Sequence, residues 1–94
     1  MTRVSDDVVA AALASLSGWR RDGEAITKTF SFATFRDAIG FVNRIAAVAE
    51  AADHHPDILI RYRRVTLTYS THSEGGLTDK DLAGAREAER LASS

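Results

Sequence analysis

The stretch ILIRYRRVTLTYST, residues 58–71, decides the fold class, because it reads as two strands joined by a short turn. Apolar and polar side chains alternate on both sides of a turn near Arg63 and Arg64, so each strand has one apolar and one polar face. This alternation predicts an antiparallel hairpin in a sheet that is covered on one side only.

A second hairpin is predicted before this one. Asp22 and Gly23 form a strong two-residue turn signal, and they follow Trp19 and a pair of arginines. The return strand, residues 26–32, again alternates between apolar and polar side chains. The chain therefore contains four predicted strands in two hairpins.

Three helices are predicted around the hairpins, each opened by a hydroxyl side chain. Ser5 is a suitable N-cap for a helix that ends before Gly18. Thr34 with Asp37 and Thr78 with Asp81 have the spacing of capping boxes, which predicts helices over about 35–52 and 79–91.

The resulting order is α-β-β-α-β-β-α. Hairpins with one apolar face predict an α+β fold, a two-layer sandwich in which a four-stranded antiparallel sheet carries its helices on one face. A chain of 94 residues supports a single core, so residues 1–94 are expected to form one domain.

The helix over 35–52 is unusually apolar. Its expected core stripe consists of Phe35, Ala38, Ile39, Val42, Ile45, Ala46 and Ala49. A second apolar seam, which predicts either a wide core face or a contact with another subunit, consists of Phe41, Ile45, Val48 and Ala52. We therefore expect a homo-oligomer, a dimer or a tetramer.

Composition excludes several classes of function. The net charge of −1 provides no basic field, which argues against a nucleic-acid partner. The absence of cysteine excludes disulfides, thiolate nucleophiles and cysteine-based metal sites. The sequence starts without a signal-peptide pattern and has no apolar run near the roughly 20 residues of a membrane span, so we expect no membrane partner and a cytoplasmic location.

The three histidines are the best candidates for chemistry. His54 and His55 lie before the third strand and His72 lies just after the fourth, so the hairpin can bring all three to one edge of the sheet. Three interpretations remain open at this point: polar loop residues without a shared site, a zinc site of three imidazoles, or a metal-free acid–base site. Glu50 and Asp53 lie close enough in the sequence to orient an imidazole.

The chain resembles the pterin-4a-carbinolamine dehydratase family. The resemblance rests on Glu50-Ala-Ala-Asp53-His54-His55-Pro56, on Ser70-Thr71-His72 and on Gly76-Leu77-Thr78-Asp79-Lys80-Asp81, and it extends upstream through Gly18-Trp19 and the helix over 35–50. The family's four-stranded antiparallel sheet with three helices on one face agrees with the predicted order.

The resemblance implies dehydration of 4a-hydroxytetrahydrobiopterin to the quinonoid dihydropterin, in tetrahydrobiopterin recycling, by a hydro-lyase that uses neither cofactor nor metal. It implies that His54, His55 and His72 are the catalytic residues, with His54 and His72 handling the two proton transfers and His55 positioning the ring. It also implies substrate binding by Asp53, Ser70, Thr71 and Ser73, and orienting roles for Glu50 and Asp81.

Two further expectations follow from the resemblance. Family members form dimers and tetramers by sheet extension and helix packing, which implies contacts through the sheet edge and the helix over 35–52. Some members act by binding, as a transcriptional coactivator or an enzyme-assembly factor, and a non-catalytic interaction module is therefore the alternative function. Ile58 stands where better-known members carry an aromatic residue, which affects the expected shape of the pterin pocket.

Overall fold

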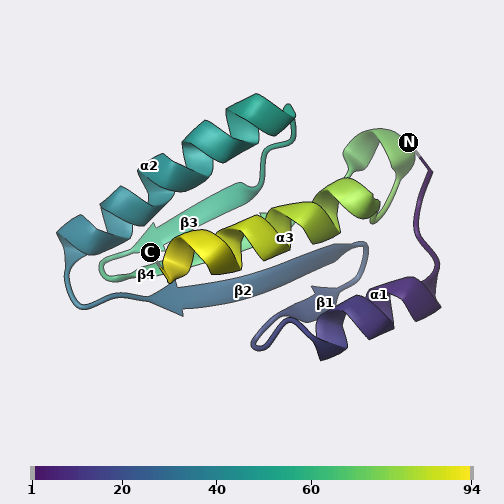
Figure 1. Ribbon diagram of the computed structural model, residues 1–94, viewed down its shortest axis with the longest axis horizontal. Coiled ribbons are helices and arrows are strands. Elements are labelled where there is room, and N and C mark those ends of the chain that lie inside the picture. The colour runs from purple at the N-terminus through teal and green to yellow at the C-terminus, as the bar shows by residue number, and fades with distance from the viewer. Residues whose placement is uncertain (1, 94) are drawn as a thin grey trace.

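The computed structural model describes residues 2–93 and has the predicted order of elements (Figure 1). The elements are α1 (Asp6–Ala14), β1 (Arg20–Asp22), β2 (Ala25–Ser31), α2 (Phe35–Ala52), β3 (Asp57–Arg61), β4 (Arg64–Tyr69), a short 3₁₀ helix (His72–Glu74) and α3 (Asp79–Ala92).

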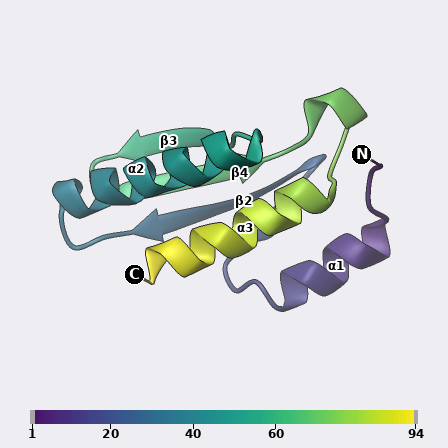
Figure 2. The same cartoon turned by 45° about the horizontal axis from the view of Figure 1, so that its top comes forward.

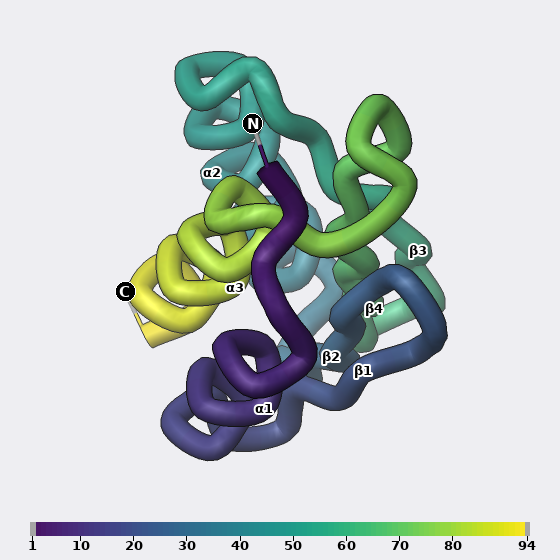
Figure 3. The backbone as a smooth tube through the Cα atoms, turned by 90° about the vertical axis from the view of Figure 1, so that its right-hand side faces the viewer, coloured from purple at the N-terminus to yellow at the C-terminus, as the bar shows by residue number. Residues whose placement is uncertain are grey.

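The four strands form one antiparallel sheet in the order β1-β2-β4-β3. The two hairpins therefore meet through β2 and β4, whose register runs from Ile26 opposite Tyr69 to Ser31 opposite Arg64. β3 pairs only with β4 and lies at an edge of the sheet. All three helices lie on the same side of the sheet, as the end-on view shows (Figure 3). The α+β sandwich is thereby confirmed.

The two faces of the sheet differ as the alternation predicts. Buried side chains on the helical side include Ile26, Phe30, Val65 and Leu67. The open side carries threonines opposite one another on β2 and β4. Thr27 and Thr68 are hydrogen-bonded at 3.0 Å, and Thr29 and Thr66 at 2.7 Å.

The predicted core stripe of α2 is partly wrong. Phe35 is 50% exposed, whereas Phe41, assigned to the second seam, is fully buried 5.0 Å from the rings of both Phe30 and Phe32. Ile45 is buried as well. Phe41 and Ile45 therefore belong to the core of this chain and are not free to form a contact with another subunit.

The structure differs from the predictions in three details: the end of α1, the position of the β3–β4 turn and the cap of α2. α1 ends at Ala14, earlier than expected, and the turn between β3 and β4 is formed by Tyr62 and Arg63, with Tyr62 in the left-handed region at φ 54°. The Thr34 hydroxyl accepts the Asp37 N–H at 3.0 Å, but the reciprocal bond of a capping box is absent among residues 2–93. By contrast, Thr78 and Asp81 form the complete capping box.

α3 crosses the sheet between α1 and α2, and its N-terminal end lies near the end of α2 (Figure 2). None of the helices in the described part of the chain is long and apolar enough to cross a membrane.

Candidate active site

A sharp reversal after α2 places the two adjacent histidines. Asp53 ends the helix in the left-handed conformation, at φ 50° and ψ 43°, which aspartate tolerates better than most residues. The backbone N–H of His54 donates to the Ala49 carbonyl at 3.1 Å, and Pro56 leads the chain into β3. This reversal sends consecutive side chains in different directions.

His54 points into the protein and binds a buried carboxylate. Its Nε2 lies 2.6 Å from Oδ1 of Asp81, and the His54 ring stacks on Tyr69 with ring centroids 6.2 Å apart. Asp81 has no exposed surface. The side chain of His54 is therefore held in one orientation by a hydrogen-bonding partner and a ring contact.

Asp81 is itself held by the turn that precedes α3. Its Oδ2 accepts the backbone N–H of Thr78 at 2.9 Å, as the second half of the capping box. The same oxygen accepts the Thr71 hydroxyl at 2.7 Å. The carboxylate therefore connects the start of α3, the segment after β4 and the histidine after α2.

His55 points outward and pairs with Glu50 one turn earlier. Its Nε2 is hydrogen-bonded to Oε2 of Glu50, and both side chains are exposed. This pair is accessible to solvent and to a ligand, in contrast to the pair formed by His54 and Asp81.

His55 and His72 line the same hollow. Its volume is about 320 Å³, and it lies at the end of the open face of the sheet where β3 begins and β4 ends. The lining residues are Glu24, Ala25, His55, Asp57, Thr68, Ser70, His72 and Gly75. Its mixture of imidazole, carboxylate and hydroxyl groups suits a polar heterocycle.

His54 lines a different, smaller hollow of about 110 Å³ between α2 and α3, together with Tyr69, Lys80, Gly84 and Glu87. Burial, together with the carboxylates of Asp81 and Glu87, raises the pKa of Tyr69 to about 12. The expected meeting of three histidines at one edge is therefore found for His55 and His72, whereas His54 faces the helical side.

The remaining predicted site residues divide into three groups. Ser70 lines the hollow, and its hydroxyl donates to the Glu24 carbonyl at 2.8 Å. Asp53 and Ser73 line neither histidine hollow. Thr71 is buried, and its hydroxyl is engaged with Asp81 and Thr78.

Sequence reasoning missed several lining residues. Glu24 lies in the β1–β2 turn and reaches the hollow only because β2 pairs with β4. Asp57 and Thr68 lie opposite each other on β3 and β4, on the open face. Strand alternation could have found this last pair, because it places both residues on the polar side of the second hairpin.

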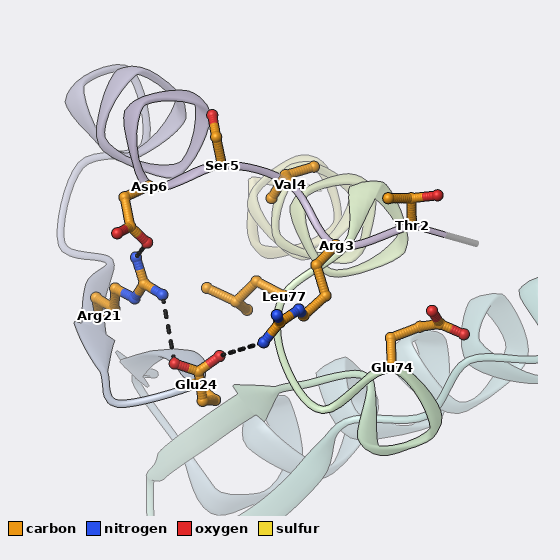
Figure 4. A pocket seen from close by; sticks show the side chains of 9 residues that line it. All are labelled: Thr2, Arg3, Val4, Ser5, Asp6, Arg21, Glu24, Glu74 and Leu77. Carbon is orange, nitrogen blue, oxygen red and sulfur yellow. Dashed lines mark hydrogen bonds and ion pairs between the residues drawn. The ribbon is translucent and has the colours of Figure 1, made fainter.

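A larger hollow than that of His55 and His72 lies beside the N-terminal segment (Figure 4). Its volume is about 710 Å³, and Glu24 is the residue that it shares with the hollow of His55 and His72. Arg21 contacts Asp6 at 2.8 Å and Glu24 at 3.7 Å, and Arg3 lies 4.0 Å from Glu24. The two arginines that line this hollow, Arg3 and Arg21, are therefore already paired with carboxylates.

The two adjacent imidazoles diverge toward separate carboxylates, and within residues 2–93 no three histidine, aspartate or glutamate side chains converge in the manner of a metal site. The geometry instead provides two histidine–carboxylate pairs and a third histidine at the mouth of a polar hollow.

The chain matches known proteins over nearly its whole length. The family model of pterin 4 alpha carbinolamine dehydratase matches residues 2–91. A relative from Thermomicrobium roseum, provisionally named a pterin-4-alpha-carbinolamine dehydratase, is 50% identical over 93 residues, covering 99% of this chain and 100% of the relative. A relative from Mycobacteroides abscessus with the same provisional name is 55% identical over 83 residues, 88% of each chain.

Two solved structures have the same fold. The transcriptional coactivator/pterin dehydratase from Brucella melitensis has a TM-score of 0.93 at 40% identity, over 97% of this chain and 99% of that one. A pterin dehydratase-like protein described as a RuBisCO assembly factor of the alpha-carboxysome has a TM-score of 0.70 at 26% identity, over 82% and 92%. The chain therefore belongs to the pterin 4 alpha carbinolamine dehydratase family.

Proposed function

We propose that this protein dehydrates a 4a-hydroxytetrahydropterin, with 4a-hydroxytetrahydrobiopterin as the expected substrate, to the quinonoid dihydropterin. Family membership supports the reaction class. The observation that carries the proposal is the polar hollow lined by His55 and His72, with His54 held by Asp81 on the other side of the same turn.

The reaction needs two proton transfers and no change of oxidation state. The bond between ring carbon 4a and its hydroxyl oxygen breaks, the neighbouring ring nitrogen loses its proton, and a carbon–nitrogen double bond forms as water leaves. An acid must protonate the departing oxygen and a base must accept the proton from nitrogen. Imidazole is suited to both tasks near neutral pH, and each transfer contributes roughly 10²- to 10⁴-fold.

The three histidines divide these tasks. His55 and His72, which both line the hollow, carry the two proton transfers, with His55 oriented by Glu50, and His54 holds the turn before β3 from the helical side. Ser70 and Asp57 offer a hydroxyl and a carboxylate to the polar edge of the pterin. The Asp81 carboxylate orients the ring of His54 through Nε2.

The test is dehydration of freshly generated 4a-hydroxytetrahydropterin, followed by absorbance against a blank without protein. We expect acceleration by the wild type, a loss of roughly 10²-fold or more in each of His55→Ala and His72→Ala, and a further loss in the double variant. Tyr62→Ala is the control, because Tyr62 lies at the β3–β4 turn, at the far end of the sheet from the histidines. A wild type no faster than the blank would refute the proposed activity.

A non-catalytic interaction module is the second candidate function. The edge strand β3 offers a surface for assembly that either function would use. β3 pairs on one side only, and Ile58, Leu59 and Ile60 on it are exposed, followed by Tyr62. Edge strands with exposed apolar residues readily pair with another chain. We infer that a second copy of this protein pairs along β3, as a dimer or as part of a tetramer, with exposed residues of α2 forming the other contact.

The enzyme and a pure interaction module are distinguished by one comparison. An enzyme turns over the pterin as the purified homo-oligomer, whereas a module forms a stable complex with a different protein and leaves the pterin unchanged. The polar histidine hollow favours the enzyme, because an adaptor has no need of it.

A further inference from the structure

Asp81 collects hydrogen-bond donors from three segments of the chain. The His54 ring nitrogen Nε2, the Thr71 hydroxyl and the Thr78 backbone N–H lie 2.6, 2.7 and 2.9 Å from its carboxylate oxygens. A backbone N–H can only donate, so Oδ2 must be an acceptor. Because Asp81 is completely buried, water does not replace any of these partners.

The hydroxyl groups beside Asp81 have only one consistent arrangement. The single proton of the Thr71 hydroxyl is donated to Asp81, so the contact of 2.9 Å between Thr71 and Thr78 must use the proton of Thr78. The Thr78 oxygen in turn accepts the Lys80 backbone N–H at 3.3 Å. The two hydrogen bonds to Oδ2 are therefore both donated to it, the arrangement expected of an ionised carboxylate.

An ionised Asp81 determines which nitrogen of His54 carries the proton. Oδ1 has no proton to donate, so Nε2 of His54 must be the N–H. Nδ1 of His54 has no hydrogen-bond partner among residues 2–93 and is not sealed from solvent. The ring plane is fixed by stacking on Tyr69.

We propose that Thr71 is a positioning residue which, through Asp81, keeps the proton of His54 on Nε2 and thereby fixes the turn that carries His55 into the hollow. Its hydroxyl is thereby engaged inside the protein and does not bind the pterin, contrary to the expectation from the family resemblance. The part that concerns the substrate rests on the proposed dehydratase function. The part that concerns the tautomer does not.

Three substitutions test the tautomer directly, by nitrogen-15 NMR of the histidine side chains of the full chain. In the wild type, neutral His54 should carry its proton on Nε2. In Asp81→Asn, the amide oxygen must face the Thr78 N–H, which cannot reverse, so the amide NH₂ faces His54 and the proton should move to Nδ1. In Thr71→Val a population with the proton on Nδ1 should appear, and in Thr71→Ser it should not.

Kinetics provide the second readout. Thr71→Val should lower kcat by roughly 10-fold, the effect of losing one hydrogen bond to a charged group, with KM changed less than about 2-fold. Thr71→Ser should restore kcat. Thr66→Val is the matched control, because it removes a 2.7 Å bond between threonines on the open face of β4, away from the histidines.

The outcomes separate the two claims. A wild-type His54 with its proton on Nδ1, or a Thr71→Val variant with the wild-type tautomer and kcat, overturns the inference. If no form of the protein dehydrates pterin, the proposed function fails, and the NMR comparison still decides the role of Thr71.

Discussion

Gly84 offers a sharp test of how closely α3 packs on the sheet beside the site. A Cβ atom at Gly84 would lie 2.5 Å from Cε1 and 2.8 Å from Cζ of Tyr69, far inside van der Waals contact. Tyr69 is buried and packs against Trp19 and His54, with ring centroids at 6.1 and 6.2 Å. The ring therefore cannot move aside without disturbing both neighbours.

Two opposing effects determine the sign of Gly84→Ala. Alanine improves helix propensity by about 1 kcal/mol, whereas overpacking a rigid core contact costs about 1–3 kcal/mol. We expect the second effect to prevail, with a net loss of up to about 2 kcal/mol and a decrease in Tm of up to roughly 16 °C for a domain of this size.

Gly40 provides the matched control, because it lies inside α2 and its nearest neighbour would be the flexible end of Arg44, at 3.5 Å. Gly40→Ala should stabilise the protein by about 0.5–1 kcal/mol. Urea unfolding of the two variants should therefore give opposite signs. Equal stabilisation by both substitutions would refute the packing argument, and a Tyr69→Leu background should abolish the penalty at Gly84 if the argument is correct.

Three further predictions concern pH, assembly and the pocket. Burial and nearby carboxylates raise the pKa of Tyr69 from 10.0 to about 12, so the folded state holds a proton that the unfolded state releases. The contribution of this proton to the free energy of unfolding is complete below pH 10 and is lost between pH 10 and 12, at up to about 1.4 kcal/mol per pH unit. Tyr69→Phe should lack this pH dependence when urea unfolding is measured across that range. Leu59→Lys should convert a wild-type dimer or tetramer into a monomer by light scattering, because a charged residue blocks pairing along β3, and a monomeric wild type would contradict this. Ile58 is 38% exposed and lies opposite Leu67, on the helical side of the sheet and outside the hollow of His55 and His72, so Ile58→Trp should fit and change KM for the pterin by less than about 2-fold, and a clear decrease in KM would contradict binding in that hollow.

The strands and caps were predictable because their signals are local. Alternation in the second hairpin fixes which side chains face the helices. Thr78 and Asp81 have the spacing of a capping box and form both of its bonds, whereas Thr34 and Asp37, with the same spacing, form only one. The core stripe of α2 was less predictable. Two apolar stripes lie next to each other on that helix, and the choice between them depends on where Phe30 meets Phe41, which is a tertiary contact.

The histidine site, too, was predictable where the signal is local and not where it depends on tertiary structure. The proline after His55 predicts that adjacent imidazoles diverge, but the left-handed Asp53 decides that His54 turns inward, and aspartate carries no strong signal for that conformation. His54 consequently leaves the hollow lined by His55 and His72. Sequence spacing could place all three residues near one edge of the sheet without distinguishing its two sides.

Asp81 explains why a capping residue and an orienting residue can be the same group. Its Oδ2 closes the capping box with Thr78, three residues away, and its Oδ1 binds His54, 27 residues away. The first contact is visible in the sequence and the second is not, because it requires α2 and α3 to end beside each other. One carboxylate makes both contacts and so links the start of α3 to the imidazole. A displacement of the start of α3 therefore also changes the orientation of His54. Substitutions at Asp81 should therefore change stability and His54 chemistry together, whereas Thr71→Ser should leave both intact.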